Sequence, residues 1–420
     1  MDYLAEKLAT PIIDRYDVLV CGGGPAGLGA AIAASRLGLR TLLVERYGFL
    51  GGAWTANLVT PIFDATDKGG IVSELCGRLR AQGWIGGLIG ASCDLEKLKV
   101  LLDELCTEAG VELLFHTLVV GAIREGEKIG GIVTENKSGR QAFRGKIVID
   151  CTGDGDIAAK AGVPFQVGSE PLHSTQAMTT MLKLHNVDFV QRQPQELLAL
   201  MQEGQKKAPG YEIGFDCPWL IDCPDGSAVL QYVHVRGRTG TDAKDLTAAE
   251  LEGRKQALAA YEFLKANVRG FERAVLEQVA PQIGVRETRR IKGEYYLTET
   301  DLRAGKTMDF PDATFICNFN IDIHDEDTKK QTVERIPPYT IPYRCLVPVA
   351  VDNLLVAGRC ISGSRVAMAA YRVTGNCLAM GQVAGTAAAL AIQGGITPRQ
   401  VSYSQLREKL ASQKMILADR

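Results

Sequence analysis

The chain has 420 residues, including 45 Gly, 16 Pro and 11 Cys. Glycine therefore makes up about 11 % of the chain, against about 7 % in an average protein. The glycines follow no G-X-Y period and proline is scarce, which excludes a collagen-like or a Pro/Gly-rich disordered chain. The net charge of −2 excludes a strong positive electrostatic field that would attract nucleic acid or an anionic membrane. This length predicts two or three domains, and the extra glycine indicates close backbone approach to a ligand, a turn or another segment.

The cysteines and the apolar segments indicate a reduced protein without a membrane anchor. The 11 Cys are odd in number, scattered, and form no C-x-x-C pair, so we expect free and mostly buried thiols. The N-terminal segment lacks the apolar core that is typical of a signal peptide. The most apolar stretch, 377–392, is short and contains Gln382 and Thr386, which favours a buried helix over a bilayer span. We therefore expect a cytoplasmic protein that binds neither membrane nor nucleic acid.

The first predicted elements form a βαβ unit. A strand at 17–21 ends at Gly22, a helix follows at 26–37, and a second buried strand at 41–44 is followed by Glu45. Further along, apolar spacing predicts a helix over 71–81. Asp94 caps the next predicted helix, which ends at Gly110 and precedes a strand at 111–115.

A β-meander comes next, with strands predicted at 118–124, 129–136 and 142–150. Its last strand runs into Asp150-Cys151-Thr152-Gly153-Asp154. The chain then changes character, with two long charged helices at roughly 188–204 and 247–280 and strands between them. A buried strand at 353–357 and a helix of small residues at 376–393 return to the earlier pattern.

These elements predict an α/β fold. We expect a Rossmann-type dinucleotide-binding domain, with a central parallel sheet and a β-meander, built from residues 1–170 and 341–420. Residues 171–340 are expected to form an inserted α+β substrate or cap domain.

The turn after the first strand carries a dinucleotide-binding motif. Gly22 permits the tight turn, Gly24 lets a pyrophosphate approach the backbone, and Gly27 lets the helix pack on the strand. Glu45 follows the second strand, where a carboxylate accepts hydrogen bonds from a ribose diol and disfavours a 2′-phosphate. The motif predicts dinucleotide binding, with NADP disfavoured.

Four segments, in order, resemble a known family. They are DVLVCGGGPAGLGAAIAASRLGLRTLLVERYGFLGG (17–52), IVIDCTGDGD (147–156), VRETRRIKGEYYLTETDL (285–302) and NLLVAGRCISGSRVAMAAYRVTGNCLAMGQVAGTAAAL (353–390). The chain resembles FAD-dependent oxidoreductases of the glutathione-reductase and hydroxybenzoate-hydroxylase superfamily. Its nearest likeness is to the mostly uncharacterised group related to fumarate-reductase flavoproteins.

The resemblance implies FAD as the cofactor and assigns a set of contacts to it. Gly52 would pass the pyrophosphate and flavin, Val119 would offer backbone to the adenine, and Gly358 would lie under the ribityl chain. The helix that begins near Gly375-Asn376 would point its positive end at the flavin C2 oxygen. The full set of expected cofactor residues is Gly22, Gly24, Pro25, Ala26, Gly27, Glu45, Arg46, Gly52, Val119, Thr152, Gly153, Asp154, Gly358, Arg359, Gly375 and Asn376.

Arg359 departs from the family pattern, because many relatives carry Asp after this late Gly to bind the ribityl hydroxyls. Two roles stay open for Arg359. Either its side chain contacts the pyrophosphate, or it makes no direct contact and the backbone holds the ribityl chain. A second GxGxxG and a C-x-x-C pair are both missing from the sequence. A built-in NAD(P)H domain and a redox-active disulfide are therefore not expected, and the external electron donor or acceptor is left open.

Substrate-side candidates come from His, Tyr and Arg residues, because flavin chemistry still requires a proton carrier and a group that holds the substrate. The candidates chosen for catalysis are His173, His324, Arg365 and Arg372. For both arginines the alternative is an ion pair that holds the loop. Acidic neighbours could orient His324 or raise its pKa, and they favour a solvated acidic loop over a metal site. Arg286, Arg289 and Arg290 beside Glu287 favour a salt-bridged strand face over anion recognition.

The expected function is hydride transfer between flavin N5 and a small polar metabolite, at a CH–OH, CH–NH or CH–CH group. Two alternatives stay open: a flavin monooxygenase that uses NAD(P)H and O2, and a flavin-bearing tRNA-modification or interaction protein. The absence of a basic stripe argues against the second. Whether the chain forms a homo-oligomer is also left open.

Overall fold

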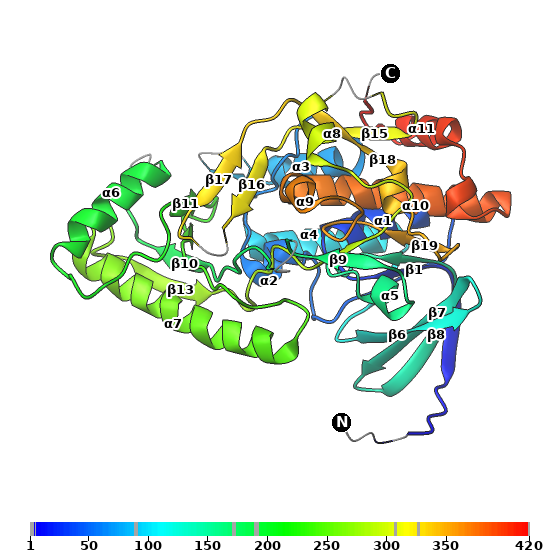
Figure 1. The fold of residues 1–420 in the computed structure, drawn as a ribbon, viewed down its shortest axis with the longest axis horizontal. Helices are drawn as coiled ribbons and strands as arrows, with labels where there is room; N and C mark the ends of the chain where they lie inside the picture. The colour runs from blue at the N-terminus through cyan, green and yellow to red at the C-terminus, as the bar shows by residue number, and fades with distance from the viewer. Residues whose placement is uncertain are drawn as a thin grey trace.

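The computed structural model describes residues 4, 6–87, 91–169, 174–188, 193–305, 309–325 and 328–418. Its centre is a sheet in the order β5-β2-β1-β8-β7-β6, with β19 also paired to β8 (Figure 1). β5, β2, β1, β8 and β19 run parallel. The strands of this sheet are β1 (Ile12–Cys21), β2 (Thr41–Val44), β5 (Glu112–Leu114), β6 (Leu118–Glu125), β7 (Lys128–Asn136), β8 (Gly139–Asp150) and β19 (Leu354–Val356). The predicted α/β class, with a parallel sheet and a meander, is confirmed.

β8 joins the meander to the parallel sheet. It pairs parallel with β1 from Ala142 to Asp150, and it also pairs antiparallel with β7 over its first half and parallel with β19 at its end. The strand thus carries the chain from the meander into the centre of the parallel sheet. Its end, at Asp150, comes beside the end of β1 at Cys21. Strand ends of a parallel sheet that meet in this way form a ligand-binding edge.

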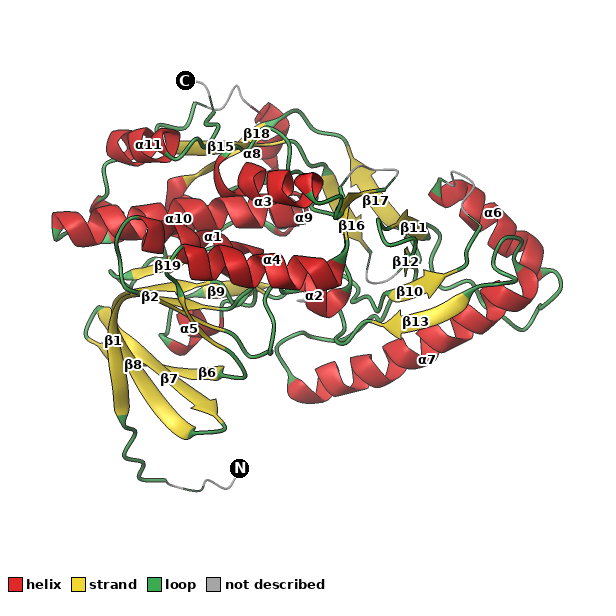
Figure 2. Cartoon of the chain, turned by 180° about the vertical axis from the view of Figure 1, so that it is seen from behind, coloured by secondary structure: helices red, strands yellow, loops and turns green. Residues whose placement is uncertain are grey.

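Most helices of this part cover one side of the sheet, and the meander and one short helix, α5 (Asp156–Lys160), lie on the other (Figure 2). The helices are α1 (Pro25–Arg36), α2 (Ala53–Asn57), α3 (Gly70–Ala81), α4 (Leu95–Glu108), α5 (Asp156–Lys160), α9 (Arg365–Tyr371), α10 (Thr374–Gly394) and α11 (Tyr403–Ser412). α1 and α10 pack backbone to backbone, because a Cβ on Gly381 would lie 1.9 Å from the Ala26 carbonyl oxygen. The Asp94 side chain accepts a hydrogen bond from the Lys97 amide and caps α4, as predicted.

α10 is the one helix among the described residues that is long and apolar enough to cross a membrane. However, 89 % of its most apolar window is buried inside the protein. The helix packs between α1, α3 and α11. Its apolar composition is therefore accounted for by its place in the core.

A second sheet has the order β11-β12-β10-β13 and its own hydrophobic core. Its elements are β10 (Leu182–His185), β11 (Trp219–Asp222), β12 (Ala228–Gln231), β13 (Val275–Val279), α6 (Pro194–Gln205) and α7 (Ala243–Asn267). Leu182 and Leu184 share this core with residues of α6 and α7. Met181 and Gln231 line the cavity described below instead. We call this unit the cap sheet.

Short two-stranded pairs connect the cap sheet to the central sheet. They are β14 (Arg289–Ile291) with β9 (Phe165–Val167), β15 (Ala313–Cys317) with β18 (Tyr339–Pro342), β16 (Ile321–His324) with β17 (Gln331–Glu334), and β3 (Ile85–Gly86) with β4 (Ser92–Cys93). α8 (Glu299–Ala304) lies in the same region. Many residues between Ile291 and Leu346 pack into the core of the central sheet, whereas the core of the cap sheet spans Leu182 to Ala274.

Two expectations about local structure were wrong. The helix expected at 247–280 ends at Asn267, because residues 275–279 pair with β10 as β13. The acidic segment around His324 is a buried strand and no solvated loop: β16 pairs with β17, and His324 is 2 % exposed. The run of acidic residues suggested a loop. The sequence does not show that Arg372, which is distant in the chain, pairs with the Asp322 carboxylate and allows it to be buried.

Candidate active site

A cavity of about 760 Å³ runs from the Gly-rich turn after β1 to the cap sheet and β16. This volume lies within the range of about 300–1,000 Å³ that is typical of ligand sites. One end is lined by Gly22, Glu45 and Thr152, at the ends of β1, β2 and β8, and the other by Trp219 and Gln231 of the cap sheet. The cavity thus spans both parts of the molecule.

The Gly-rich turn presents open backbone to this cavity. Gly22 has φ +103°, and a Cβ there would lie 2.5 Å from the Cys151 carbonyl oxygen. A Cβ on Gly27 would lie 1.8 Å from the Gly22 carbonyl oxygen, so Gly27 serves the packing of the helix on the strand. Gly24 differs, because a Cβ there would meet only the Gly52 Cα, at 3.7 Å. The space beside Gly24 is therefore cavity, and α1 points its N-terminus at it.

Glu45 holds the shape of the turn. Its Oε2 accepts a hydrogen bond from the Gly23 amide at 2.6 Å, and its Oε1 accepts one from the Tyr47 amide at 2.9 Å. The side chain also lines the cavity, where carboxylate oxygens have lone pairs left for a diol. Arg46 lies beside it on the wall, with its Nη2 donating to Gln282 Oε1 at 3.1 Å.

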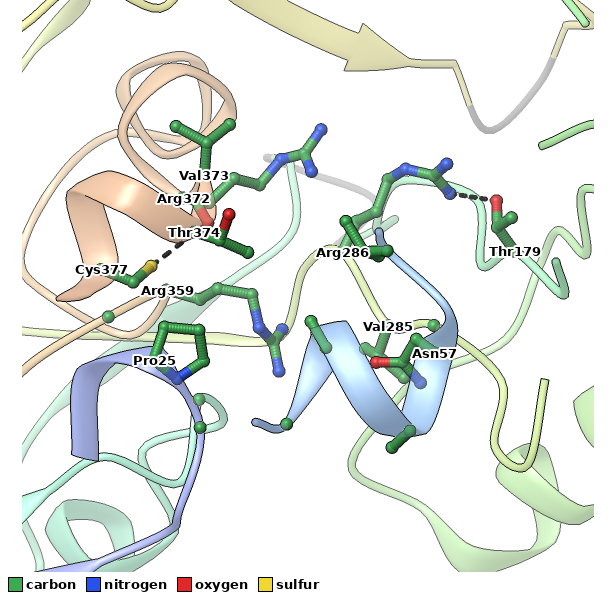
Figure 3. Close-up of a pocket in the computed structure, with 18 of the residues that line it drawn as sticks. Pro25, Asn57, Thr179, Val285, Arg286, Arg359, Arg372, Val373, Thr374 and Cys377 are labelled. Atoms are coloured by element: carbon green, nitrogen blue, oxygen red, sulfur yellow. Dashed lines mark hydrogen bonds between the residues drawn. The ribbon is translucent and has the colours of Figure 1, made fainter. Parts of the chain in front are cut away.

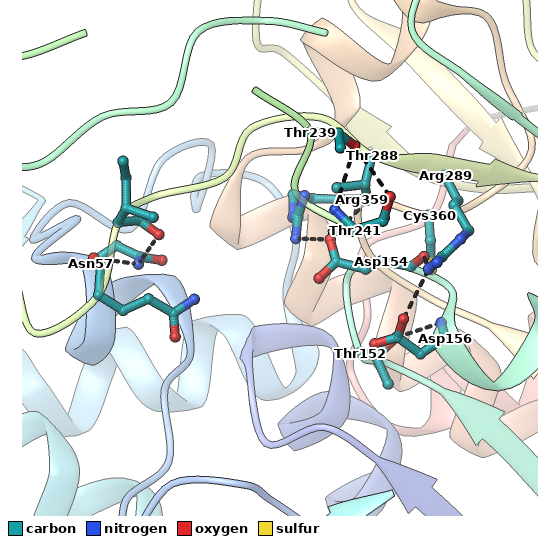
Figure 4. Close-up of polar contacts among 12 residues, drawn as sticks. Asn57, Thr152, Asp154, Asp156, Thr239, Thr241, Thr288, Arg289, Arg359 and Cys360 are labelled. Atoms are coloured by element: carbon teal, nitrogen blue, oxygen red, sulfur yellow. Dashed lines mark hydrogen bonds and ion pairs between the residues drawn. The ribbon is translucent and has the colours of Figure 1, made fainter. Parts of the chain in front are cut away.

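Arg359 and Asp154 form an ion pair on the cavity wall (Figure 4). Asp154 Oδ1 accepts from Arg359 Nη2 at 2.8 Å and from Thr288 Oγ1 at 2.7 Å. Nη1 of Arg359 is buried and has no hydrogen-bond partner among the described residues. In Figure 3 the guanidinium extends into the pocket beside Pro25. This free donor is placed to meet an anionic group near the Gly-rich turn.

The predicted cofactor residues fall into two groups. Those that line the cavity are Gly22, Gly24, Pro25, Ala26, Glu45, Arg46, Gly52, Val119, Thr152, Gly153, Asp154, Gly358 and Arg359. Gly27, Gly375 and Asn376 lie behind the wall. A Cβ on Gly375 would lie 2.5 Å from the Phe63 carbonyl oxygen, so this glycine lets α10 approach that loop. The amide of Asn376 is buried, and neither its nitrogen nor its oxygen has a partner among the described residues.

At the other end of the cavity, Arg372 and Asp322 form a buried ion pair. Arg372 Nη2 donates to Asp322 Oδ2 at 3.2 Å and to the Asp322 carbonyl oxygen at 3.0 Å. Gln331 Nε2 donates to the other carboxylate oxygen at 2.6 Å. His324 Nε2 lies 3.3 Å from Asp322 Oδ2. Arg372, Asp322 and His324 all line the cavity, so a carboxylate, a cation and an imidazole meet at one point of its wall.

His324 is also paired with a second buried histidine. His324 Nδ1 lies 2.9 Å from His234 Nε2, and His234 Nδ1 lies 3.0 Å from the Tyr232 carbonyl oxygen. The Phe215 ring stacks on His234, with ring centroids 3.8 Å apart. We call His234 and His324 the histidine pair.

The histidine pair lacks one proton. Both ends of the chain Asp322–His324–His234–Tyr232 O are acceptors, so its three contacts need three protons, whereas two neutral imidazoles carry two. Burial, followed by the charge of Arg286, lowers the pKa of His324 to about 4 and that of His234 well below its usual value. Asp322 does raise the His324 pKa, as its acidic neighbours led us to expect, but burial and the charge of Arg286 outweigh this effect. The pair is neutral at pH 7 and can accept one proton.

Arg286 reaches the same end of the cavity from the segment after β13. Its Nη1 donates to the Ala177 carbonyl oxygen at 2.6 Å and to Thr179 Oγ1 at 2.5 Å (Figure 3). Its neighbours behave as the sequence predicted: Arg290 pairs with Glu287 at 2.7 Å and Arg289 with Asp156 at 2.8 Å. Arg286 differs, since its hydrogen bonds among the described residues are both to neutral oxygens.

The remaining catalytic candidates do not reach this point. Arg365 pairs with Glu287 at 3.2 Å and does not line the cavity, which matches the ion-pair alternative. His173 lies outside the described residues. The pairing of His324 with His234 could not be seen in the sequence, because the two residues are 90 positions apart.

The residues present fit FAD. The wall beside Gly24 is open, Arg359 offers a buried free donor, and the cavity continues past Gly358 toward Thr374 at the N-terminus of α10. Backbone donors and a helix N-terminus suit a pyrophosphate. The unpartnered Asn376 amide lies at the start of α10, behind the wall where the resemblance expects the flavin.

Comparisons with known proteins agree with this site. Residues 17–410 match the model of a family described as FAD dependent oxidoreductase. A dihydrolipoyl dehydrogenase of Trypanosoma brucei brucei is 32 % identical over 163 residues, which are 38 % of this chain and 32 % of that protein. A digeranylgeranylglycerophospholipid reductase of Thermoplasma volcanium is 27 % identical over 158 residues, which are 34 % of this chain and 40 % of that protein. The matched segments thus span less than half the length of these relatives.

Among solved structures, the flavin-dependent brominase Bmp2 superposes with a TM-score of 0.52 at 16 % identity. The match covers 94 % of this chain and 83 % of the brominase. At this identity the likeness concerns the fold. It extends over the central sheet and the cap sheet alike.

Proposed function

Because this chain belongs to the FAD-dependent oxidoreductase family, is an enzyme and uses FAD, we propose that it transfers a hydride between flavin N5 and a carbon of a small polar metabolite. The reacting group is a CH–OH, CH–NH or CH–CH unit. One observation carries this proposal: a continuous cavity joins the Gly-rich turn to the end where Arg372, Asp322 and His324 meet.

The nucleotide end of the cavity would hold FAD through the chain's own residues. The amides at the start of α1 and the Arg359 guanidinium would bind the pyrophosphate, and Glu45 would accept hydrogen bonds from the ribose. Bound FAD supplies a site that takes up or releases a hydride at N5. The substrate would then lie between the flavin and the cap sheet.

The histidine pair would handle the accompanying proton. When a CH–OH or CH–NH group is oxidised, the substrate carbon would lose its hydrogen as a hydride, and the O–H or N–H proton would pass to His324 Nε2. A C=O or C=N bond forms in the substrate, so charge and atoms balance. In the reductive direction both transfers reverse. Asp322 would stabilise the protonated pair, because its Oδ2 lies 3.3 Å from His324 Nε2 and can accept a hydrogen bond from the newly bound proton.

Three finer assignments belong to this proposal. We propose a relation to the glutathione-reductase and hydroxybenzoate-hydroxylase superfamily, and within it to the fumarate-reductase-related group, on the four sequence segments. We propose that residues 171–340 form the substrate domain, because the cap sheet provides much of the far cavity wall. A cytoplasmic location is supported by the eleven free cysteines, ten of which are buried.

Anaerobic titration of the holoenzyme tests the proposal. A panel of hydroxy acids, amino acids, sugars and alcohols is added in turn, and loss of flavin absorbance is recorded. Bleaching by one class, without NAD(P)H or O2, supports hydride transfer from substrate. Rapid reduction by NAD(P)H that depends on an aromatic substrate, with a hydroxylated product, would establish the monooxygenase alternative instead. Retardation of tRNA in a gel would favour the tRNA-modification alternative.

A further inference from the structure

Resting on the proposed function, we propose that the substrate is a small monocarboxylate whose anionic group is held between Arg286 and Arg372. The reacting CH–OH or CH–NH carbon lies close to that carboxylate. In Figure 3 Arg286 and Arg372 both stand along the same part of the pocket, and the Arg286 guanidinium is directed toward Thr179. Both residues line the cavity, and they come from segments that are 86 positions apart in the chain.

Arg286 is a buried cation without a carboxylate partner. The residue is 8 % exposed, and among the described residues its hydrogen bonds go only to the Ala177 carbonyl oxygen and the Thr179 hydroxyl. Both bonds use Nη1, so Nε and Nη2 remain for a ligand. A buried charge is costly unless it is paired, and charged side chains are therefore rarely left unpaired in a protein interior.

Arg372 also has a donor to spare. Its Nη2 binds Asp322, but its Nε is buried with no hydrogen-bond partner in the described part of the chain. The planar guanidinium presents several donors in a fixed fork, which matches the two oxygens of a carboxylate. Both guanidinium groups therefore have donors left for the oxygens of an anion.

The local charge favours a monoanion. Arg286 and Arg372 carry two positive charges, Asp322 carries one negative charge, and the histidine pair is neutral. The other carboxylates on the wall lie elsewhere: Glu45, Asp154 and Asp156 stand at the nucleotide end, and Asp222 stands on β11. The surplus of one positive charge suits a carboxylate and not a phosphate dianion.

The electrostatics of Arg286 support this geometry. Burial, and then the charge of Arg372, lowers the pKa of Arg286 to about 9. A bound anion would relieve both effects, because it neutralises the repulsion and replaces lost water. Asp322 opposes this lowering of the pKa only in part. Unlike Arg290, which pairs with Glu287 at 2.7 Å, Arg286 makes no ion pair among the described residues.

Asp322 contacts both the proposed anion site and the proton acceptor, His324. Asp322 Oδ2 contacts both Arg372 Nη2 and His324 Nε2, at 3.2 and 3.3 Å. A carboxylate bound to Arg372 therefore brings the neighbouring carbon and its heteroatom close to His324. This spacing fits a substrate in which the hydroxyl or amino group stands next to the carboxylate.

The test uses the holoenzyme and two probes of equal shape, benzoate and neutral benzamide. Binding is followed by the change in flavin absorbance. We expect benzoate to perturb the flavin and benzamide to bind at least tenfold more weakly, since a hydrogen bond to a charged group is worth about 1.5–3 kcal/mol. Equal affinity for the two probes, or no binding of benzoate, would overturn the proposal. This comparison uses the unmodified enzyme and does not depend on any variant.

Variants locate the site. Arg286→Gln is expected to weaken benzoate binding by roughly ten- to a hundredfold, for the same reason. Arg289→Gln is the matched control, because it removes a positive charge from the same segment but off the cavity wall. If Arg286→Gln shifts the flavin midpoint potential while benzoate affinity is unchanged, the guanidinium serves the flavin and the proposal is wrong.

Failure of this inference differs from failure of the proposed function. Bleaching of the flavin by an uncharged metabolite, with no response to carboxylates, would leave hydride transfer in place and remove the anion site. Tight benzoate binding without bleaching by any carboxylate in the panel would keep the anion site and contradict hydride transfer from such a substrate.

Discussion

Arg359 Nη2 lies 2.8 Å from Asp154 Oδ1, and this ion pair ties the loop after β19 to the loop after β8. Both loops follow strands that pair in register in the central sheet. Asp154 is further held by Thr288 Oγ1 at 2.7 Å. The pair therefore fixes one guanidinium nitrogen and leaves the other, Nη1, buried and free at the nucleotide end of the cavity.

Replacing Arg359 should weaken FAD binding. In Arg359→Met the free donor is lost, so we expect the Kd for FAD to rise by roughly ten- to a hundredfold, the usual effect of losing a hydrogen bond to a charged group. Fluorescence titration of the flavin-stripped protein measures this. Arg399→Met is the control, since Arg399 is likewise an ion-paired arginine but lies off the cavity wall. An unchanged Kd in Arg359→Met would exclude a direct contact.

Gly24 and Gly27 should respond differently to alanine. At Gly24 the backbone is extended and a Cβ fits, so Gly24→Ala is expected to fold but to lose FAD affinity, because the methyl group enters the pyrophosphate position. At Gly27 a Cβ would lie 1.8 Å from a carbonyl oxygen, so Gly27→Ala should lower the thermal midpoint itself. Circular dichroism and flavin content separate the two effects. Normal FAD content in Gly24→Ala would contradict the assigned position of the pyrophosphate.

The histidine pair should make the protein sensitive to acid. The His324 pKa is about 4 in the folded protein and 6.5 as a free side chain, so the unfolded chain binds more protons between these values. Stability should therefore fall as the pH drops from about 6.5 toward 4. Between pH 7 and pH 5, we expect the thermal midpoint of His324→Gln to fall by less than that of the wild type. His185→Gln, which changes a half-exposed histidine, should follow the wild type. Parallel curves for His324→Gln and wild type would contradict the neutral state of the pair.

Carboxylate binding should draw a proton into the site. The charge of Arg286 lowers the pKa of both histidines, and a bound anion offsets that charge. We expect net proton uptake when benzoate binds near pH 6, measured by calorimetry in two buffers of different ionisation enthalpy. The uptake should vanish in His324→Gln. Identical heats in the two buffers for the wild type would show that the anion and the pair are not coupled.

Thiol reactivity provides a simpler check of the fold. All eleven cysteines are free, ten are buried, and Cys217 alone is half-buried. Burial raises the pKa of Cys106 and Cys377 to about 12, so their reactive thiolate form is scarce at pH 8. A thiol reagent should modify at most one cysteine in the native protein and all eleven after unfolding. Cys217→Ser should remove the native reaction, and rapid modification of several thiols would contradict the packing.

Local sequence patterns determined the parallel sheet, the meander and the Gly-rich turn. The meander follows from the alternation of apolar residues in 118–150 and the turn from the spacing of Gly22, Gly24 and Gly27, whereas the parallel sheet follows from the βαβ pattern of the first strands. The end of α7 was missed, since residues 275–279 become a strand only by pairing with β10. Helical propensity alone cannot anticipate a partner 90 residues earlier in the chain.

For the site, the sequence by itself determined the dinucleotide end, because the motif brings its backbone donors, helix and carboxylate together within one βαβ unit. Only the tertiary structure decided the other end. It separated Arg372, which lines the cavity, from Arg365, which pairs with Glu287 behind it. It also left Arg286 unpaired among paired neighbours and joined His324 to His234. These outcomes depend on which distant charges share a buried space, because in a low-dielectric interior the partner of a charge decides its role.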